Sequence, residues 1–164
     1  MRSQRESKLP SEDDFSADMM PPVYRVQLVR EAGRRRPEVN SGHDAAKILR
    51  RYLELEDREY FVILMLDVKN SIIGIHTVSV GTLNAALISP REVFKAAILA
   101  NAASVILGHN HPSGDTTPSP EDLQVTDRLK KAGALLDIDV LDHVIIGEAG
   151  AFISMRANGL MPRD

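Results

Sequence analysis

The feature that most limits the fold of this chain is an unbroken apolar run, YFVILML, from Tyr60 to Leu66. The run is too short for a typical helix and is partly β-branched, which predicts a strand buried on both faces. Such a strand lies inside a sheet whose two faces are both covered. After the polar segment that follows, the residues from Ile72 to Val80 predict the returning strand of a hairpin.

Signals for helices alternate with signals for strands along the rest of the chain. Ser41, with Asp44 three residues later, predicts the start of one helix. Ser-Pro pairs at Ser89 and Ser119, each followed by an acid three residues after the serine, predict two more. The segments SVILGHNH, DVLDHVIIG and AFISMRANG predict further strands. This alternation predicts the α/β class, with a mixed sheet between helices.

The length of 164 residues suits one domain and a tail. Residues 1 to about 21 mix charge, Ser and Pro without periodicity, which predicts a flexible tail. The alternating segment from Val23 to Glu31 predicts a strand that leads into the domain. No run approaches the roughly 20 apolar residues of a membrane span, and the N-terminus does not resemble a signal peptide. We therefore expect a cytoplasmic protein with no membrane contact.

Composition removes several kinds of chemistry. The chain has no cysteine, which excludes disulfides, thiol nucleophiles and every zinc site built on sulfur. A metal ion must therefore be bound by His, Asp or Glu. The formal net charge of -3 gives no global reason to expect binding to nucleic acid, because domains that do so usually carry a strong basic excess.

The residues best suited to chemistry lie in HNHPSGDTTPSPED, residues 109 to 122. Side chains two residues apart on a strand point the same way, so His109 and His111 can present both imidazoles to one point. Asp122, in the first turn of the predicted helix, can supply an oxygen ligand. Three such ligands leave the fourth position of a tetrahedral zinc ion open to water, as in catalytic sites.

Two simpler interpretations apply to the same residues. His-x-His is a short motif that also occurs by chance. Ser119 and Asp122 form a helix start in their own right, because Ser89, Pro90 and Glu92 repeat the pattern without any histidine.

The complete pattern is H-x-H-P, then six residues, then S-x-x-D, and it resembles the JAMM signature of the MPN (JAB) metalloprotease superfamily. The segments LGHNHPSGD, PSPED and LDHVIIG resemble the RadC-like branch, over roughly residues 40 to 164. The resemblance implies a cytidine-deaminase-like α/β fold. It implies a metallohydrolase domain at residues 39–164 and a zinc ion held by His109, His111 and Asp122. The tail and lead-in strand expected from composition and alternation then occupy residues 1–38.

The resemblance also implies the roles of further residues. Ser119 would help to hold the oxyanion of a tetrahedral intermediate, and a glutamate before the first core strand would act as general base. Glu59, directly before Tyr60, is the best match, with Glu56 as the second candidate; an acid in this position is also often simply solvated. His143 would either orient a zinc ligand through its other ring nitrogen or be a polar residue buried for packing.

The function implied is a zinc-dependent peptidase or isopeptidase that acts on a peptide or protein conjugate. The alternative is a RadC-like protein associated with DNA repair that binds or cleaves nucleic acid. We expect the chain to lack the helix-hairpin-helix region usual in full-length RadC-like proteins, which disfavours that alternative. A metal-free scaffold is a third interpretation, although here the ligand set is complete. A zinc deaminase is disfavoured because its signature requires cysteines.

Overall fold

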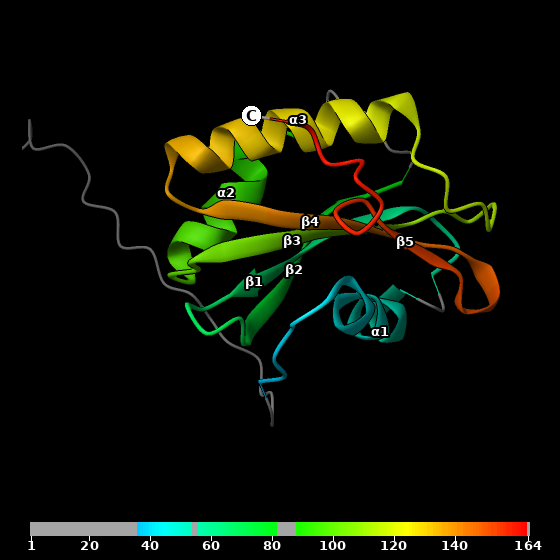
Figure 1. The fold of residues 1–164 in the computed structure, drawn as a ribbon, viewed down its shortest axis with the longest axis horizontal. Coiled ribbons are helices and arrows are strands. Elements are labelled where there is room, and N and C mark those ends of the chain that lie inside the picture. The colour runs from blue at the N-terminus through cyan, green and yellow to red at the C-terminus, as the bar shows by residue number, and fades with distance from the viewer. Residues whose placement is uncertain (1–35, 54–55, 82–87, 164) are drawn as a thin grey trace, which may run out of the picture.

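The computed structural model describes residues 36–53, 56–81 and 88–163, and the predicted lead-in strand from Val23 to Glu31 lies outside these ranges. The elements follow one another along the chain as shown in Figure 1. They are α1 (Gly42–Leu53), β1 (Tyr60–Leu66), β2 (Ile72–Val80), α2 (Pro90–Leu99), β3 (Ser104–Asn110), α3 (Pro120–Leu135), β4 (Asp139–Ile146), the short 3-10 helix η3 (Glu148–Gly150) and β5 (Phe152–Ser154).

The five strands form one mixed sheet in the order β2-β1-β3-β4-β5. β1 runs antiparallel to both β2 and β3, β3 and β4 are parallel, and β5 is antiparallel to β4. The hairpin of β1 and β2 has the predicted bounds at both ends. The predicted α/β class with a mixed sheet is therefore confirmed.

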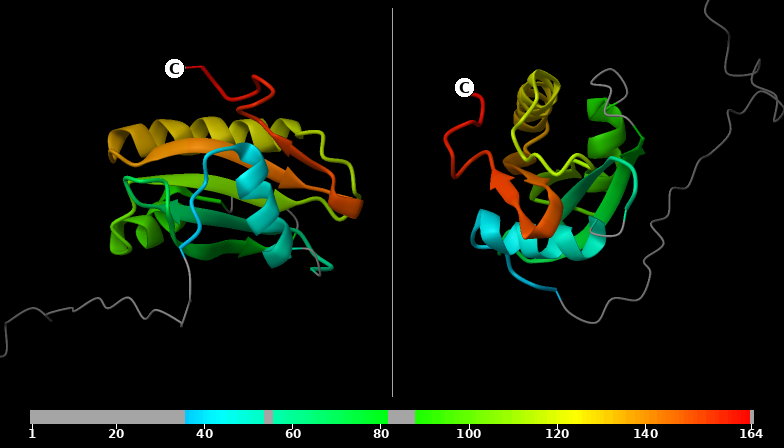
Figure 2. Two further views of the ribbon diagram at one scale, coloured as in Figure 1. Left: turned by 60° about the horizontal axis from the view of Figure 1, so that its bottom comes forward. Right: turned by 90° about the vertical axis from the view of Figure 1, so that its right-hand side faces the viewer.

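Helices cover both faces of this sheet, with α1 on one side and α2 and α3 on the other (Figures 1 and 2). A hydrophobic core lies on each face of the sheet, and alternate residues of β1 point into one core and then the other. Phe61, Ile63 and Met65 pack in the core on the side of α2 and α3. Val62, Leu64 and Leu66 pack in the core on the side of α1. Because both sets are buried, the strand needs the unbroken apolar run from which it was predicted.

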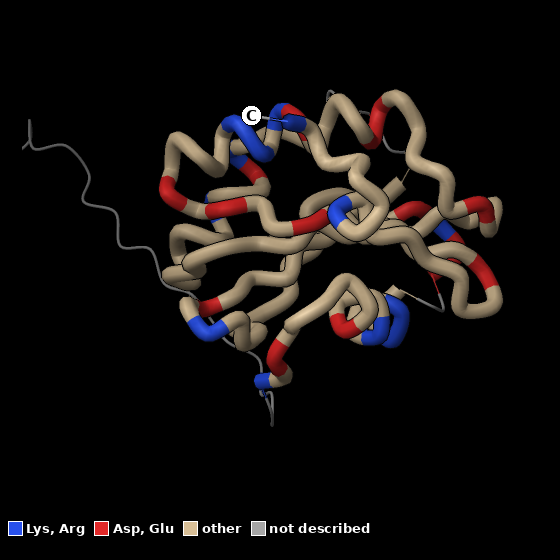
Figure 3. Tube along the Cα trace, viewed as in Figure 1, with Lys and Arg blue, Asp and Glu red and all other residues tan. Residues whose placement is uncertain are grey.

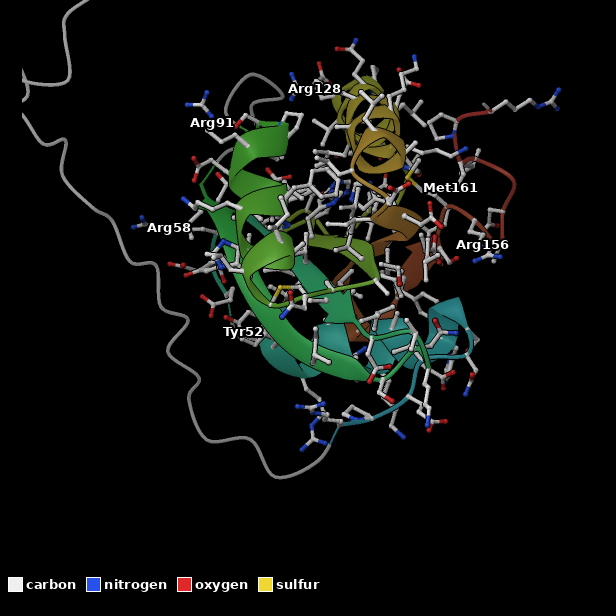
Figure 4. All side chains as sticks on the ribbon, turned by 90° about the vertical axis from the view of Figure 1, so that its left-hand side faces the viewer. Tyr52, Arg58, Arg91, Arg128, Arg156 and Met161 are labelled. Carbon is white, nitrogen blue, oxygen red and sulfur yellow. The ribbon has the colours of Figure 1, made fainter. Side chains whose placement is uncertain are left out.

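The helix starts also match the sequence signals. Ser41 and Asp44 cap α1, since the Ser41 Oγ donates to the Asp44 carboxylate at 2.8 Å and accepts from the Asp44 backbone N–H at 3.2 Å. Ser89 caps α2 through its side-chain oxygen, which accepts from the Glu92 backbone N–H. Arg128, on α3, donates a hydrogen bond to the carbonyl of Ile88 and so ties α3 to the chain just before α2 (Figure 4).

Gly133 does not end α3, because the helix continues to Leu135. The residue with a left-handed backbone that follows the helix is Asp137, with φ of 54°. Gly133 serves a different purpose. A Cβ atom added there would lie 2.4 Å from the carbonyl oxygen of Ile138, so glycine permits the close passage of the chain that leads into β4.

Within the ranges given above, no helix is both long enough and apolar enough to cross a membrane.

Candidate metal centre

Two histidines meet where the central strand β3 ends, at the side of the molecule that carries the loop leading into α3 (right-hand end of Figure 1). His109 lies within β3 and is fully buried, between Phe61 of β1 and Ile145 of β4. His111 follows the end of the strand, and its side chain is 16% exposed. The two Nε2 atoms are 2.8 Å apart, so both imidazoles face one point, as their spacing predicts.

The carboxylate of Asp122 faces the same point from the first turn of α3. Its Oδ1 lies 3.2 Å from the His109 Nε2 and its Oδ2 lies 3.4 Å from the His111 Nε2. The backbone N–H and the hydroxyl of Ser119 both donate to Oδ2, at 2.7 and 2.8 Å, and complete a capping box. Oδ1 is buried and accepts no hydrogen bond from any residue in the described ranges. The helix cap thus fixes one oxygen and leaves the other facing the histidines.

The electrostatics of Asp122 favour a cation beside it. Burial alone would raise the pKa of its carboxyl group, but the contacts with His109 and His111 outweigh burial and hold this pKa far below its ordinary value. The carboxylate is therefore ionised although it is inaccessible to solvent. In return, the contact with Asp122 raises the pKa of His111. An ionised carboxylate that favours a positive charge on the imidazole beside it also favours a bound metal ion.

Glu59 is the fourth side chain at this point. One of its carboxylate oxygens and one nitrogen from each of His109 and His111 lie within 4.8 Å of one another. Glu59 comes directly before β1, and because β1 is antiparallel to β3, the start of β1 lies beside the end of β3. Glu56, the other candidate base, is hydrogen-bonded to Tyr60 instead, and this contact raises the pKa of the Tyr60 hydroxyl.

Asn110, between the two histidines, is a residue whose part in the site was not predicted. Its side-chain oxygen accepts from the Tyr60 backbone N–H at 2.8 Å, and its side-chain nitrogen donates to the Arg58 carbonyl at 2.7 Å. The amide therefore binds the backbone on both sides of Glu59 and fixes that residue to the end of β3. The place of Asn110 between the two histidines was the only sequence signal for this role. The signal was weak, because residues next to each other on a strand point to opposite sides and Asn110 therefore points away from the histidines.

We expect Asn110→Ala to lower the free energy of unfolding by about 1–3 kcal/mol, because a donor and an acceptor of the Arg58–Tyr60 backbone lose their partners. Urea denaturation followed by circular dichroism measures the change. Asn40→Ala, at an exposed position before α1 where, among the described residues, only the backbone N–H makes a hydrogen bond, is a control for loss of an asparagine side chain. An Asn110→Ala protein as stable as the wild type would show that the amide does not hold this segment.

The loop after His111 fixes the tautomer of that histidine. The His111 Nδ1 lies 2.6 Å from the backbone carbonyl oxygen of Asp115, and a carbonyl can only accept, so Nδ1 carries a proton. The neutral ring then has its lone pair on Nε2. Asp115 also accepts from the Thr117 backbone N–H at 2.9 Å through its carboxylate, a contact typical of aspartate in turns.

These residues fit a single divalent cation. Two imidazole nitrogens and the oxygens of Asp122 and Glu59 converge, and one of these oxygens, Oδ1 of Asp122, is a buried acceptor without a hydrogen bond in the described structure. A bound cation would satisfy that oxygen and offset the repulsion between facing lone pairs. A set of nitrogen and oxygen donors without sulfur suits zinc and similar divalent ions. Ser119, predicted to hold an oxyanion, here donates its hydroxyl proton to Asp122.

A cavity of about 510 Å³ opens beside His111. Its walls include the segment after α1, the end of β4 and η3. Among the lining residues are Arg50, Glu56, Asp57, Pro112 and Glu148. Arg50 donates to the carbonyl of Gly150, which joins α1 to η3 across the cavity wall. The cavity reaches the exposed part of His111, and its volume lies within the range of small-molecule binding sites.

A mixed sheet with helices on both faces, together with paired histidines and carboxylates at the end of the central strand, defines an α/β domain of the JAB/MPN type with a candidate metal centre. A family model described as "RadC-like JAB domain" matches residues 39–160, which is more than half of the chain. The chain belongs to this RadC-like JAB domain family.

Curated relatives agree with this assignment. A UPF0758 protein of Rubrobacter xylanophilus is 48% identical over 137 residues, which cover 84% of this chain and 59% of the relative. A UPF0758 protein of Caldanaerobacter subterraneus is 53% identical over 121 residues, covering 74% of this chain and 52% of the relative. One of Desulforamulus reducens is 45% identical over 150 residues, covering 85% and 66%. The chain thus spans between about half and two thirds of the length of these relatives.

Proposed function

We propose that this chain is a zinc-dependent hydrolase that cleaves an amide bond in a peptide or protein conjugate. The observation that carries the proposal is the convergence of His109, His111, Asp122 and Glu59, with the Oδ1 of Asp122 buried and without a hydrogen bond from the described residues. His109, His111 and Asp122 would hold the metal ion. When bound, zinc supplies a Lewis acid and lowers the pKa of a water molecule to about 7.

The other residues supply the remaining parts of hydrolysis. Glu59 is half-buried beside the histidines, and its carboxylate accepts a proton from the attacking water. The same group then returns the proton to the leaving amine nitrogen. Ser119, at the N-terminus of α3, would turn its hydroxyl from Asp122 toward the oxygen that becomes negative on the substrate. The helix N-terminus favours negative charge at this place.

The charges around the cavity support an amide rather than a phosphodiester as the bond that is cleaved. Three acidic residues, Glu56, Asp57 and Glu148, line the cavity, against one basic residue, Arg50. Such a lining repels the closely spaced phosphates of a nucleic acid and does not repel a neutral peptide backbone.

The proposal is tested by assaying the zinc-loaded protein against a peptide library, ubiquitin-like conjugates and single-stranded DNA. We expect hydrolysis of an amide substrate by the wild type and none by His109→Ala. Glu121→Gln is the control, because Glu121 is exposed and directly precedes Asp122 in the same helical turn. Cleavage of DNA alone, or equal activity of wild type and His109→Ala, would contradict the proposal.

Duplex DNA is expected to bind weakly, with a dissociation constant no tighter than about the micromolar range of non-specific contacts at physiological salt. The reasons are the net charge of -3 and the mixture of basic and acidic residues along the described elements (Figure 3). A fluorescence anisotropy titration with labelled duplex measures the affinity. Nanomolar, sequence-selective binding would instead favour the role in DNA repair.

A further inference from the structure

A buried chain of hydrogen bonds lies behind the candidate ligands. His143, from β4, is fully buried, and its Nε2 is 2.8 Å from the Nδ1 of His109. The Nδ1 of His143 is 2.6 Å from the Thr126 hydroxyl of α3, and this hydroxyl is 2.6 Å from the backbone carbonyl oxygen of Asp122. The chain of bonds thus starts at one candidate ligand, His109, and ends at the backbone of another, Asp122.

The direction of each hydrogen bond follows from the number of protons available. The Asp122 carbonyl can only accept, so the single hydroxyl proton of Thr126 is donated to it. Thr126 must then accept from His143, whose Nδ1 therefore carries a proton. The reverse direction would leave the Thr126 and Asp122 oxygens 2.6 Å apart with no proton between them.

His143 is fully buried, and its ring nitrogens contact His109 and Thr126 and no carboxylate of the described residues, so the ring is neutral and carries one proton. With that proton on Nδ1, the Nε2 of His143 is an acceptor. The His109 Nδ1 must then donate to it, which leaves the lone pair of His109 on Nε2. That nitrogen is the one that faces Asp122 and His111.

We propose that His143 and Thr126 are positioning residues that hold His109 in the tautomer whose Nε2 is free to bind a metal ion. The inference rests on the proposed metal site, and it assigns to two residues outside the ligand set the task of preparing one ligand. Phe61 packs against both rings, with ring centroids 6.1 Å from His109 and 5.6 Å from His143, and fixes the planes in which their nitrogens meet.

Nuclear magnetic resonance of metal-free, ¹⁵N-histidine-labelled protein tests the direction of the bonds. Long-range ¹H–¹⁵N correlations report which ring nitrogen of each histidine carries a proton, and a His143→Gln sample assigns the signals. We expect His143 to be protonated at Nδ1 alone. A proton on its Nε2 would mean that the chain of bonds runs the other way and would overturn the proposal.

Zinc affinity tests the consequence for the ligand, and competition with a chromophoric chelator measures it. His143→Leu removes the acceptor for His109 and should weaken zinc binding by about 10- to 100-fold, as is typical when the partner of a ligating histidine is lost. His143→Gln keeps an acceptor oxygen and should recover most of the loss. Equal affinity of His143→Leu and wild type would overturn the proposal, because a residue needed only for packing alters stability without altering affinity.

Thr126 provides a second pair of variants if His143→Leu does not fold. Thr126→Val keeps the shape of the side chain but lacks the hydroxyl, whereas Thr126→Ser keeps the hydroxyl. We expect zinc affinity to fall in the first and to stay near wild type in the second. If neither variant differs from wild type, the hydroxyl does not orient His143. A protein that binds zinc in this His143-dependent manner but hydrolyses no substrate would contradict the proposed function and leave the present inference standing.

Discussion

Purified Asp122→Asn is expected to lose its zinc while keeping its fold. The substitution preserves the size of the side chain, and the amide oxygen can still accept the two hydrogen bonds from Ser119 that cap α3. The amide nitrogen would then take the place of Oδ1, where it can donate to the His109 Nε2. An amide nitrogen, which is neutral, would then stand where the metal ion needs an anionic ligand. Zinc binding should weaken by more than the roughly 100-fold that is typical when a ligand keeps its place but loses its hydrogen-bond partner.

Elemental analysis after dialysis against zinc measures this loss, with one zinc per chain expected in the wild type. His109→Ala should behave like Asp122→Asn. Glu121→Gln, one residue away and exposed, removes the same charge and should retain full occupancy. Full zinc occupancy in Asp122→Asn would show that Asp122 is not a ligand and would leave Glu59 as the third candidate.

Glu59→Gln is expected to retain zinc but to reduce the turnover of a substrate by roughly 100- to 10,000-fold, the usual effect of losing a positioned general base. The glutamine has nearly the same shape as the glutamate but cannot accept the proton. Glu59 lies close enough to both histidines to be a ligand as well, so zinc content and rate must be measured on the same sample.

Glu56→Gln is the matched comparison, because it removes an acid three residues earlier that contacts Tyr60. It should keep both zinc and turnover. Loss of zinc from Glu59→Gln would identify Glu59 as a ligand and not the base. A wild-type rate in Glu59→Gln, with Glu56→Gln inactive, would move the base to Glu56, and activity in both would contradict this mechanism.

The fold was largely predictable because its signals are local. The apolar run of β1 can be satisfied only inside a sheet that is covered on both faces, and the Ser-Pro pairs mark helix starts whatever surrounds them. Gly133 does not mark the end of α3, since this glycine is required by the passage of Ile138 and not by the helix end. A contact between distant segments leaves no local pattern in the sequence.

The site shows the same division between local and distant information. Ser89 with Glu92 and Ser119 with Asp122 are the same capping pattern, yet Glu92 forms an exposed ion pair with Lys95 at 2.8 Å whereas Asp122 is buried beside two histidines. Only the H-x-H motif in front of the second pair separates them in the sequence.

Other parts of the site depend on pairing between strands. Asn110 reaches Arg58 and Tyr60 because β1 and β3 are neighbours, and His143 reaches His109 because β4 lies on the other side of β3. His143 was predicted either to orient a ligand or to be buried for packing, and no pattern in the sequence connects His143 with Thr126.

The hydrogen bonds of Asn110, Ser119 and Asp115 to the segments that bear the candidate ligands have an entropic consequence. Each one restrains a ligand-bearing segment through protein groups alone, so the loss of conformational freedom occurs when the chain folds. Metal binding then requires little further loss of conformational entropy from the protein. Zinc fingers are the opposite case, since their ligands are ordered by the metal itself and chelation unfolds them. In this domain, removal of zinc by a chelator should leave the metal site empty but the domain folded.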